Sequence, residues 1–244
     1  MTSTRLPGKI LVDLAGRPML AQELARLRLC KCADDIVIAT TVNQTDDPVV
    51  ELARKEGVGC FRGDENDVLS RYLGAARQAR ADVIVRITAD CPLIDAGEVD
   101  RVVAALLDGT AKGNHGDKGL ADYASNTLER TFPRGLDAEA FHRDVLERVA
   151  RMGHTPLARE HVTYFIHRER PELFVKRSVT SQNGESHADL RWTVDEPVDL
   201  ALVRRIYELF ALGTTPLPYA DLINMVVQHP ELAAMNAHVA QKHA

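Results

Sequence analysis

Two cations four residues apart stand near the start of the chain, in the segment STRLPGK at residues 3–9. Ser3, Arg5 and Lys9 supply a hydroxyl, a guanidinium and an ammonium, while the proline and the glycine shape the backbone. This combination suits a cradle for a polyphosphate. The GxxxxGK(S/T) sequence of a P-loop is absent, and an exposed tail with two solvated cations fits the spacing equally well.

Two aspartates each follow a short apolar run that is typical of a strand. Asp90 comes after residues 83–87, and Asp195 comes after residues 190–194. Open parallel sheets bind ligands beyond the carboxyl ends of their strands, where two carboxylates can jointly hold Mg²⁺. A helix cap is the alternative for Asp90, and the metal is favoured. Glu196 and Asp199 are interpreted only as acids at a helix N-terminus.

Other charged side chains have weaker functional signals. Asp67 and Arg71 have the i, i+4 spacing of a solvated helix pair. Arg134 and Asp137 lie in a turn that can equally be a helix cap. Arg86 is more informative, because a guanidinium inside an apolar strand requires anionic partners.

The common signatures of nucleophilic and metal-hydrolase catalysis are missing from the sequence. There is no HExxH, no GxSxG and no recognisable Ser/His/Asp arrangement. The four cysteines form no CxxC, and Asp90 beside Cys91 disfavours a thiolate there.

Composition narrows the class of protein. The chain has 244 residues, of which 45% are hydrophobic, and 30 Lys and Arg against 35 Asp and Glu give a net charge of −5. We therefore expect one globular domain over residues 1–244, without a surface built for nucleic acid. With neither a signal-peptide core nor an apolar run of about 18–20 residues, we expect a cytoplasmic protein that does not bind membranes.

Strand and helix signals alternate, which predicts an α/β fold with a mostly parallel sheet and flanking helices. The Gly-rich stretch 109–119 is expected to be a flexible loop, and about residues 115–180 an inserted middle lobe. We expect strands at 36–41, 82–88, 122–126, 173–180 and 190–194. We expect helices after Pro18 and at 46–56, 64–81, 96–107, 138–152, 157–168, 197–211, 218–228 and 231–241.

Several motifs in order resemble the cytidylyltransferases of the spore coat polysaccharide biosynthesis protein F type, which are relatives of the CMP-KDO and CMP-acylneuraminate synthetases. The resemblance runs from Met1 to about residue 210. It rests on STRLPGK (3–9), LAGRPML (14–20), DVLSRY (67–72), VRITADCPLID (85–95), YASNT (123–127), RGLD (134–137), REHVT (159–163) and WTVDEPVDL (192–200).

The resemblance implies a nucleotide-diphospho-sugar transferase-like, Rossmann-like fold that transfers CMP from CTP to a sugar acid and releases pyrophosphate. A homodimer through the middle lobe is also implied. For catalysis the resemblance implies Arg5, Lys9, Asp90 and Asp195, with Mg²⁺ held by the two aspartates. It implies that Arg5 and Lys9 hold the triphosphate and that Ser3, Asp67, Arg71 and Arg86 also lie near the nucleotide. The residues implied to face the sugar are Asn126, Arg134 and Asp137.

One departure from the family concerns the first strand. Family members typically begin with a strand of the type Ile-Ile-Gln-Ala-Arg inside the sheet, and this sequence begins at the Met that would follow it. We expect an upstream start, with a degraded copy as the alternative. Two other functions stay open, a glycosyltransferase of related fold, although no Asp-x-Asp marks one, and a non-catalytic nucleotide- or sugar-binding relative.

Overall fold

Strands and helices alternate along the first half of the chain in the computed structural model, which describes residues 5–109, 120–182 and 184–240. Ser3 and most of the expected Gly-rich loop lie outside these ranges. The strands are β1 Asp13–Leu14, β2 Arg17–Pro18, β3 Val37–Thr41, β4 Gly59–Gly63, β5 Val83–Arg86, β6 Tyr123–Ser125, β7 Glu139–His142 and β8 Lys176–Ser178.

The helices match most of the predicted ones. The α-helices are α1 Met19–Leu27, α2 Asp47–Glu56, α3 Val68–Ala79, α4 Ala96–Leu107, α5 Arg143–Met152, α6 Pro156–His161, α7 Pro197–Leu209, α8 Tyr219–Val226 and α9 Pro230–Asn236. Short 3₁₀ turns cover Lys9–Leu11, Gln44–Asp46 and Pro171–Leu173, and a π-helical turn covers Phe165–Glu169.

Local side chains set several of these helix ends. The carboxylate of Asp95 accepts a hydrogen bond from the Glu98 amide at 2.9 Å and begins α4. Asp67 accepts from the Ser70 amide at 2.9 Å, so α3 begins at Val68 and not at 64 as expected. Gly57 ends α2 in the left-handed region, at φ 68°.

The described strands form a parallel pair, a four-stranded sheet and the small β1–β2 hairpin. β3 runs parallel to β4, and the larger sheet has the order β5-β7-β6-β8. Within it β7 is antiparallel to both β5 and β6, and β8 is parallel to β6. Pairing is therefore more mixed than expected. Among the described strands none joins β3 to β5.

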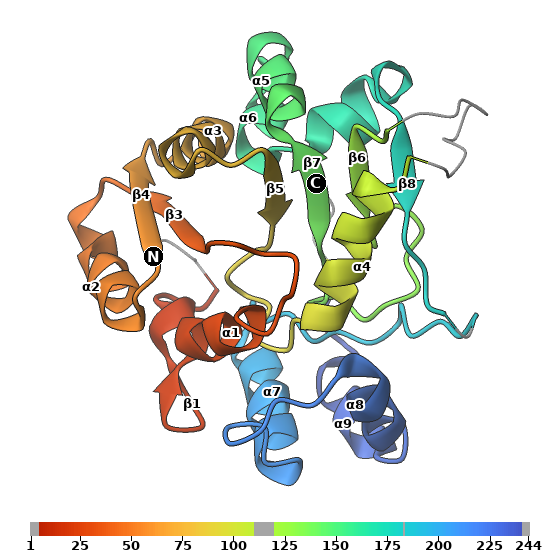
Figure 1. Ribbon diagram of the computed structural model, residues 1–244. Coiled ribbons are helices and arrows are strands. Elements are labelled where there is room, and N and C mark those ends of the chain that lie inside the picture. The colour runs from red at the N-terminus through yellow and green to blue at the C-terminus, as the bar shows by residue number, and fades with distance from the viewer. Residues whose placement is uncertain (1–4, 110–119, 183, 241–244) are drawn as a thin grey trace.

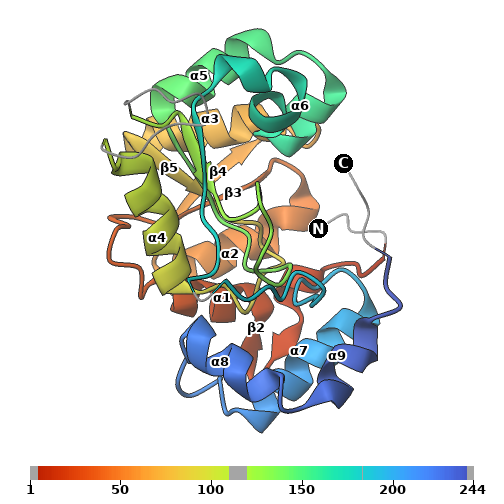
Figure 2. The same cartoon turned by 90° about the vertical axis from the view of Figure 1, so that its right-hand side faces the viewer.

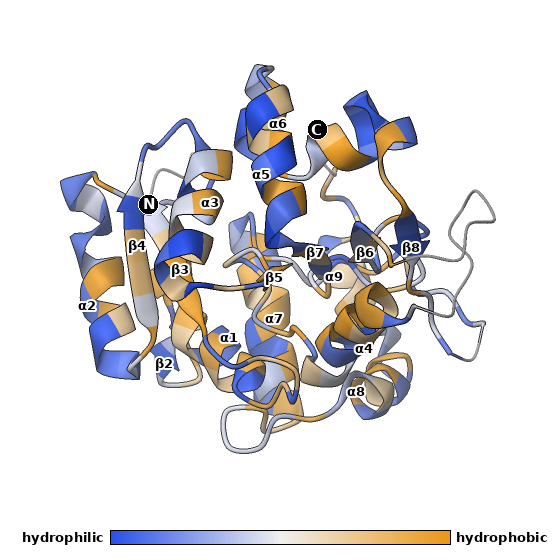
Figure 3. Cartoon of the chain, turned by 45° about the horizontal axis from the view of Figure 1, so that its top comes forward, coloured by the Kyte–Doolittle hydropathy of each residue, from blue (hydrophilic) through white to orange (hydrophobic). Residues whose placement is uncertain are grey.

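Helices cover both faces of these strands and a separate group lies at one end. α4 packs on β6 and β7, while α3 packs on β3 and β4 and contacts α5 and α6. Helices α7, α8 and α9 lie together at the opposite end from α5 and α6 (Figures 1 and 2). Hydrophilic and hydrophobic residues alternate around the helices, as amphipathic surface helices require (Figure 3).

Three predicted elements differ from the structure. The helix expected at 157–168 is divided at Val162, at φ 52°, into α6 and the π-helical turn. The expected helix 138–152 begins as strand β7, because its first residues fill the place between β5 and β6, and this tertiary pairing overrides local propensity. The expected strand 190–194 makes only a bridge between Arg191 and Arg134. It forms no regular ladder, because its amides bond to two different neighbours: Trp192 N–H donates to the Arg134 carbonyl and Val194 N–H to the Asp90 carbonyl.

The segment expected as an inserted lobe contributes β6, β7 and β8 to the sheet of β5, and its helical part packs against α3. Within residues 5–109, 120–182 and 184–240, no helix is long and apolar enough to cross a membrane.

Candidate active site

The N-terminal loop is anchored to the body of the protein. Leu6 and Ile10 pack against the buried cluster that contains Leu14, Trp192 and Val203. Gly8 takes φ 68°, a backbone conformation that favours glycine, and the 3₁₀ turn begins at the next residue. The turn therefore carries Lys9 into the structure, and the alternative of a solvated tail does not describe this residue.

Lys9 lies between the two aspartates that the sequence analysis singles out. Its ammonium donates to Asp90 Oδ2 at 2.9 Å and to Asp195 Oδ1 at 2.8 Å. Only 15% of the Lys9 side chain is exposed, against 22% for Asp90 and 18% for Asp195. Burial by itself lowers the pKa of Lys9, but the charge of Asp90 and the hydrogen bond to Asp195 outweigh it, so this pKa lies above its ordinary value.

Main-chain pairing brings the two aspartates together. Asp90 follows the carboxyl end of β5, and its carbonyl accepts the Val194 amide at 2.9 Å, one residue before Asp195. Gly135, at φ 104°, lets the turn after Arg134 lie against this segment, since a Cβ there would meet the Thr193 nitrogen at 2.5 Å. The close approach of two distant segments thus depends on backbone contacts.

Arg191 holds the carboxylate oxygen of Asp195 that Lys9 does not contact. Arg191 donates to Asp195 Oδ2 at 2.7 Å and to Asp199 Oδ1 at 3.0 Å. Asp199 also accepts from the Asn236 amide at 2.8 Å and from the Glu196 backbone N–H at 2.9 Å. Asp199 is only 1% exposed, so it is an internal anchor as well as the acid expected at the N-terminus of α7.

Arg5 completes the positive side of the site. Its guanidinium lies 3.3 Å from Asp195 and 3.1 Å from Glu196, and about a quarter of the side chain (28%) is exposed. Burial raises the pKa of Asp195, but the hydrogen bond and charge of Lys9, with Arg191 and Arg5, hold this pKa below its usual range. Asp195 is therefore a carboxylate at neutral pH.

A third carboxyl group, that of Glu23, contacts the segment that follows β5. Glu23 of α1 is 2% exposed, and its Oε2 accepts the Cys91 amide at 3.2 Å. Burial, and after it the charge of Asp90, raises the pKa of Glu23 well above its ordinary value. Burial, followed by Asp90, likewise raises the pKa of the Cys91 thiol, which makes Cys91 a poor nucleophile.

The pair Asp90 and Asp195 has the donor chemistry for a hard divalent cation. Both carboxylates contact the Lys9 ammonium, and oxygen ligands of this kind suit Mg²⁺. Among the described residues, no cluster of three or more His, Cys, Asp or Glu side chains stands ready to bind a metal. The two aspartates fit the cation only if phosphate and water supply its other ligands, as is usual for Mg²⁺.

Asp67 and Arg71 do not form the pair with each other that the spacing suggests. Asp67 caps α3 and is ion-paired with Arg159 of α6, while Arg71 donates to the carbonyls of Asp64 and Glu65. Both side chains therefore fix loops and helices of the protein. They are not joined to the cluster around Lys9 by any contact among the described residues.

Arg86 has the anionic partner that its position requires. Its Nη1 donates to Glu139 Oε2 at 3.0 Å, and its guanidinium lies over the Tyr72 ring, 5.8 Å from the centroid. The Thr163 hydroxyl donates to the same carboxylate, 3.2 and 3.1 Å from its two oxygens. Arg86 is thus part of a buried network that joins β5 to β7.

The three residues expected to face the sugar are used differently. Asn126 is 1% exposed. Its side-chain amide donates to the Leu136 carbonyl and accepts from the Ala138 N–H, so it joins the end of β6 to the segment before β7 and has both polar atoms occupied. Asp137 makes a two-pronged pair with Arg130, at 2.7 and 2.8 Å. Arg134 is half-buried, and its guanidinium has no hydrogen bond or ion pair with another described residue.

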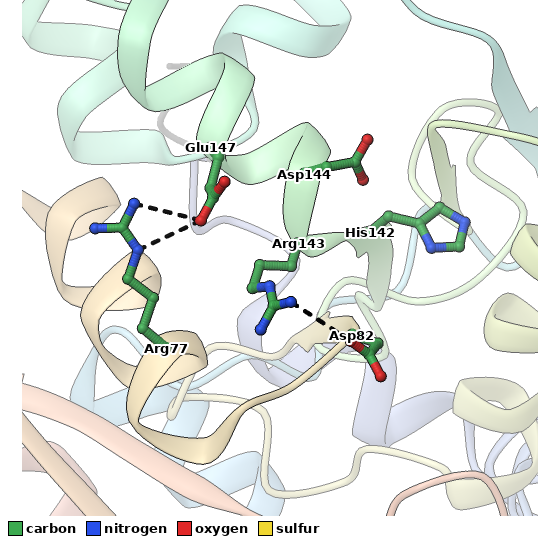
Figure 4. A pocket seen from close by; sticks show the side chains of 6 residues that line it. All are labelled: Arg77, Asp82, His142, Arg143, Asp144 and Glu147. Atoms are coloured by element: carbon green, nitrogen blue, oxygen red, sulfur yellow. Dashed lines mark hydrogen bonds and ion pairs between the residues drawn. The ribbon is translucent and has the colours of Figure 1, made fainter.

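A surface pocket of about 330 Å³ lies elsewhere, between α3 and the start of α5 (Figure 4). Its charges are largely paired, Arg77 with Glu147 at 3.3 Å and Arg143 with Asp82 at 3.6 Å. Asp82 precedes β5, at the opposite end of this strand from Asp90. Since ligands bind at the carboxyl ends of strands in such folds, the cluster around Lys9 is the stronger candidate.

An α/β fold with cations and carboxylates gathered beyond a strand end is suited to chemistry on phosphate groups. The chain belongs to the cytidylyltransferase family, whose sequence model matches residues 1–215. The enzyme is a cytidylyltransferase.

Three known proteins illustrate this relationship. A solved cytidylyltransferase of Leptospira borgpetersenii is 32% identical and superposes with a TM-score of 0.86, over 100% of this chain and 95% of that one. The spore coat polysaccharide biosynthesis protein SpsF of Bacillus subtilis is 29% identical, over 96% of this chain and 93% of its own length. The 3-deoxy-manno-octulosonate cytidylyltransferase of Anaeromyxobacter dehalogenans is 28% identical, over 87% and 88%.

Sequence reasoning missed Arg191 and Glu23. Arg191 carries the same signal as Arg86, a guanidinium inside an apolar run, which requires an anion nearby. Glu23 lies three residues after Leu20 and four before Leu27, on the apolar face of α1. An acid on that face signals a buried carboxyl group.

Proposed function

We propose that this cytidylyltransferase transfers CMP from CTP to a sugar acid, releases pyrophosphate and serves the synthesis of a surface polysaccharide or glycan. The observation that carries the proposal is the position of Lys9, with Arg5 beside it, against Asp90 and Asp195 beyond the end of β5. Cations for a triphosphate and carboxylates for a metal meet at one place. The relatives support the acceptor class, since one is named for 3-deoxy-manno-octulosonate and another for polysaccharide biosynthesis.

In the proposed reaction a hydroxyl of the sugar attacks the α-phosphorus of CTP. The new bond joins the sugar oxygen to phosphorus, and the hydroxyl proton is released to solvent. The bond between the α-phosphorus and the bridging oxygen breaks, and pyrophosphate leaves in line. Lys9 and Arg5 neutralise the phosphates, and the site holds the two reactants in position. No protein nucleophile is needed, in agreement with the high pKa of Cys91.

Asp90 and Asp195 are the residues that would hold Mg²⁺ together with phosphate oxygens. When bound, the ion supplies positive charge to the triphosphate and polarises the attacked phosphoryl group. Thr88 and Arg191 keep the two carboxylates oriented, the first by donating to Asp90 Oδ1 at 2.6 Å and the second by its bond to Asp195.

Arg134 is the residue we propose for the carboxylate of the sugar acid. Burial, and after it the charge of Arg130, lowers the pKa of Arg134. The charge of Asp137, which is paired with Arg130, offsets this only in part, and no described carboxylate lies within ion-pair distance of the Arg134 guanidinium. Its carbonyl accepts the Trp192 amide, so Arg134 lies beside the segment that leads to Asp195. An anionic ligand would supply the missing partner.

The test is pyrophosphate release from CTP with a panel of sugar acids, neutral sugars and sugar phosphates. We expect turnover with at least one sugar acid, and we expect Arg134→Gln to raise its KM about tenfold while the KM for CTP stays within twofold. Arg168→Gln, which removes an exposed arginine, is the matched control. Turnover only with neutral sugars or sugar phosphates, or an unchanged KM in Arg134→Gln, would contradict the proposed acceptor.

A further inference from the structure

The carboxylates of Asp90 and Asp195 are held in the same way, with one oxygen of each fixed by the fold. Thr88 donates to Asp90 Oδ1 at 2.6 Å, and Arg191 donates to Asp195 Oδ2 at 2.7 Å. The other oxygen of each, Asp90 Oδ2 and Asp195 Oδ1, accepts a hydrogen bond from Lys9. A single flexible side chain therefore engages one oxygen on each carboxylate at the same time.

These two oxygens are the ones a divalent cation would need. The ammonium of Lys9 lies 2.9 and 2.8 Å from them, so it fills the position between the carboxylates that the ion would take. If Lys9 moves away, Thr88 and Arg191 still orient both aspartates. Ammonium and metal are thus alternative occupants of one place.

We propose that Lys9 is a placeholder cation, which closes the metal site of the free enzyme and leaves it only for the triphosphate of the incoming nucleotide. The enzyme then takes metal and nucleotide together and excludes free metal. This inference rests on the proposed function of the site. It assigns Lys9 two successive partners, the aspartates first and the phosphates afterwards.

Charge explains why free metal does not displace the lysine. Asp195 already contacts three cations, with Lys9 at 2.8 Å, Arg191 at 2.7 Å and Arg5 at 3.3 Å. A divalent ion without an accompanying anion would add two more positive charges to this largely buried place and leave the ammonium unpaired. A triphosphate removes both costs, because its oxygens receive the ammonium and also bind the metal.

The experiment titrates Mn²⁺ into the full-length protein without nucleotide and follows free Mn²⁺ by electron paramagnetic resonance. We expect the wild type to bind Mn²⁺ at least tenfold more weakly than Lys9→Met, in which the place between the carboxylates is vacated. Lys55→Met removes an exposed lysine of α2 and makes the same change in net charge, so it should behave as the wild type. Adding Asp90→Asn to Lys9→Met should abolish the gained affinity.

A second measurement uses only the wild type and stays decisive if Lys9→Met fails to fold. Mn²⁺ is titrated with and without a CTP analogue that carries a methylene group between its α- and β-phosphorus atoms, and metal bound by the analogue in a protein-free titration is subtracted. We expect the analogue to tighten Mn²⁺ binding at least tenfold. By linkage, Mn²⁺ must then tighten binding of the analogue by the same factor.

Equal Mn²⁺ affinity in the wild type and Lys9→Met would overturn the inference, as would wild-type affinity that is the same with and without the analogue. Neither titration contains a sugar or depends on turnover. A failure to find a sugar-acid acceptor would therefore count against the proposed function and leave the role of Lys9 standing.

Discussion

The cluster of Lys9, Asp90 and Asp195 and the pair Arg86 and Glu139 both join a cation to carboxylates, but they differ in what holds the carboxylate oxygens. In the first, here called the phosphate-site cluster, two of the oxygens contact Lys9 and the others contact Thr88, Arg191 and Arg5. In the second, here called the buried pair, both carboxylate oxygens of Glu139 accept hydrogen bonds from Thr163, and one also accepts from Arg86.

The buried pair is built into the sheet. Thr163 donates to both oxygens of Glu139, Arg86 donates to one, and their side chains are 17% exposed for Arg86 and 9% for Glu139. Burial by itself lowers the pKa of Arg86, but the charge of Glu139 outweighs it and raises this pKa above its ordinary value. The guanidinium therefore stays charged and paired in the folded protein.

The difference teaches how one kind of interaction can serve two purposes. Arg86 presents a planar guanidinium inside the sheet. Replacing this cation would leave the buried charge of Glu139 without a partner, so the pair stabilises the fold. Lys9 has a flexible side chain and lies on a turn beside the end of β5. In the proposed role, another cation can replace its ammonium at little structural cost. Substitutions should therefore damage activity in one cluster and stability in the other.

The largest effect is expected in the phosphate-site cluster. Asp90→Asn keeps the size of the side chain but removes the charge that Mg²⁺ and Lys9 require, so we expect turnover to fall by about 10³-fold or more. Pyrophosphate release measures the rate, and circular dichroism and urea unfolding measure the fold. Turnover within tenfold of the wild type would refute the metal-binding role of Asp90.

The largest effect on stability is expected in the buried pair. Arg86→Met leaves Glu139 buried without its cation, so we expect the free energy of unfolding to fall by about 3–5 kcal/mol. Lys9→Met leaves Asp195 paired with Arg191 and Arg5 and leaves Asp90 bonded to Thr88, so we expect a smaller loss of about 1–2 kcal/mol. Urea denaturation of both variants gives the comparison, and equal losses would show that the two clusters are not built differently.

The sequence predicted the phosphate-site cluster better than its surroundings. Arg5, Lys9, Asp90 and Asp195 lie in motifs that end a strand or form a cationic loop, and side chains placed this way meet at one edge of an α/β sheet. The partners of Asp67 and Asp137 could not be predicted, because Arg159 and Arg130 come from segments whose docking depends on tertiary packing.

The same limit applies to the fold. Helix α2 was predictable because Pro48 and Gly57 mark its ends locally, and α4 was predictable because Asp95 caps its first turn. β7 was not, because residues 139–142 become a strand only when β5 and β6 lie on either side. Residues 190–194 have the composition of a strand, yet they bond to Arg134 and Asp90 in turn, which no local pattern encodes.

Glu23 adds a smaller effect, on the pH dependence of stability, because it is a buried carboxyl group that belongs to neither cluster. Among the described residues no cation lies within ion-pair distance of it, and burial raises its pKa well above the ordinary value of about 4.3. The folded protein thus keeps a proton that the unfolded chain releases above about pH 4.3, so stability falls as pH rises from there toward the folded-state pKa.

Glu23→Gln removes this dependence, and its amide oxygen can still accept the Cys91 N–H. We expect the variant and the wild type to be about equally stable near pH 4, where Glu23 of the wild type is largely protonated in both the folded and the unfolded chain. Toward pH 8 the variant should become the more stable of the two, because the substituted amide has no proton for the unfolded chain to release. Urea denaturation at both pH values measures this difference. A difference that is the same at pH 4 and pH 8 would mean that the folded protein does not hold Glu23 protonated.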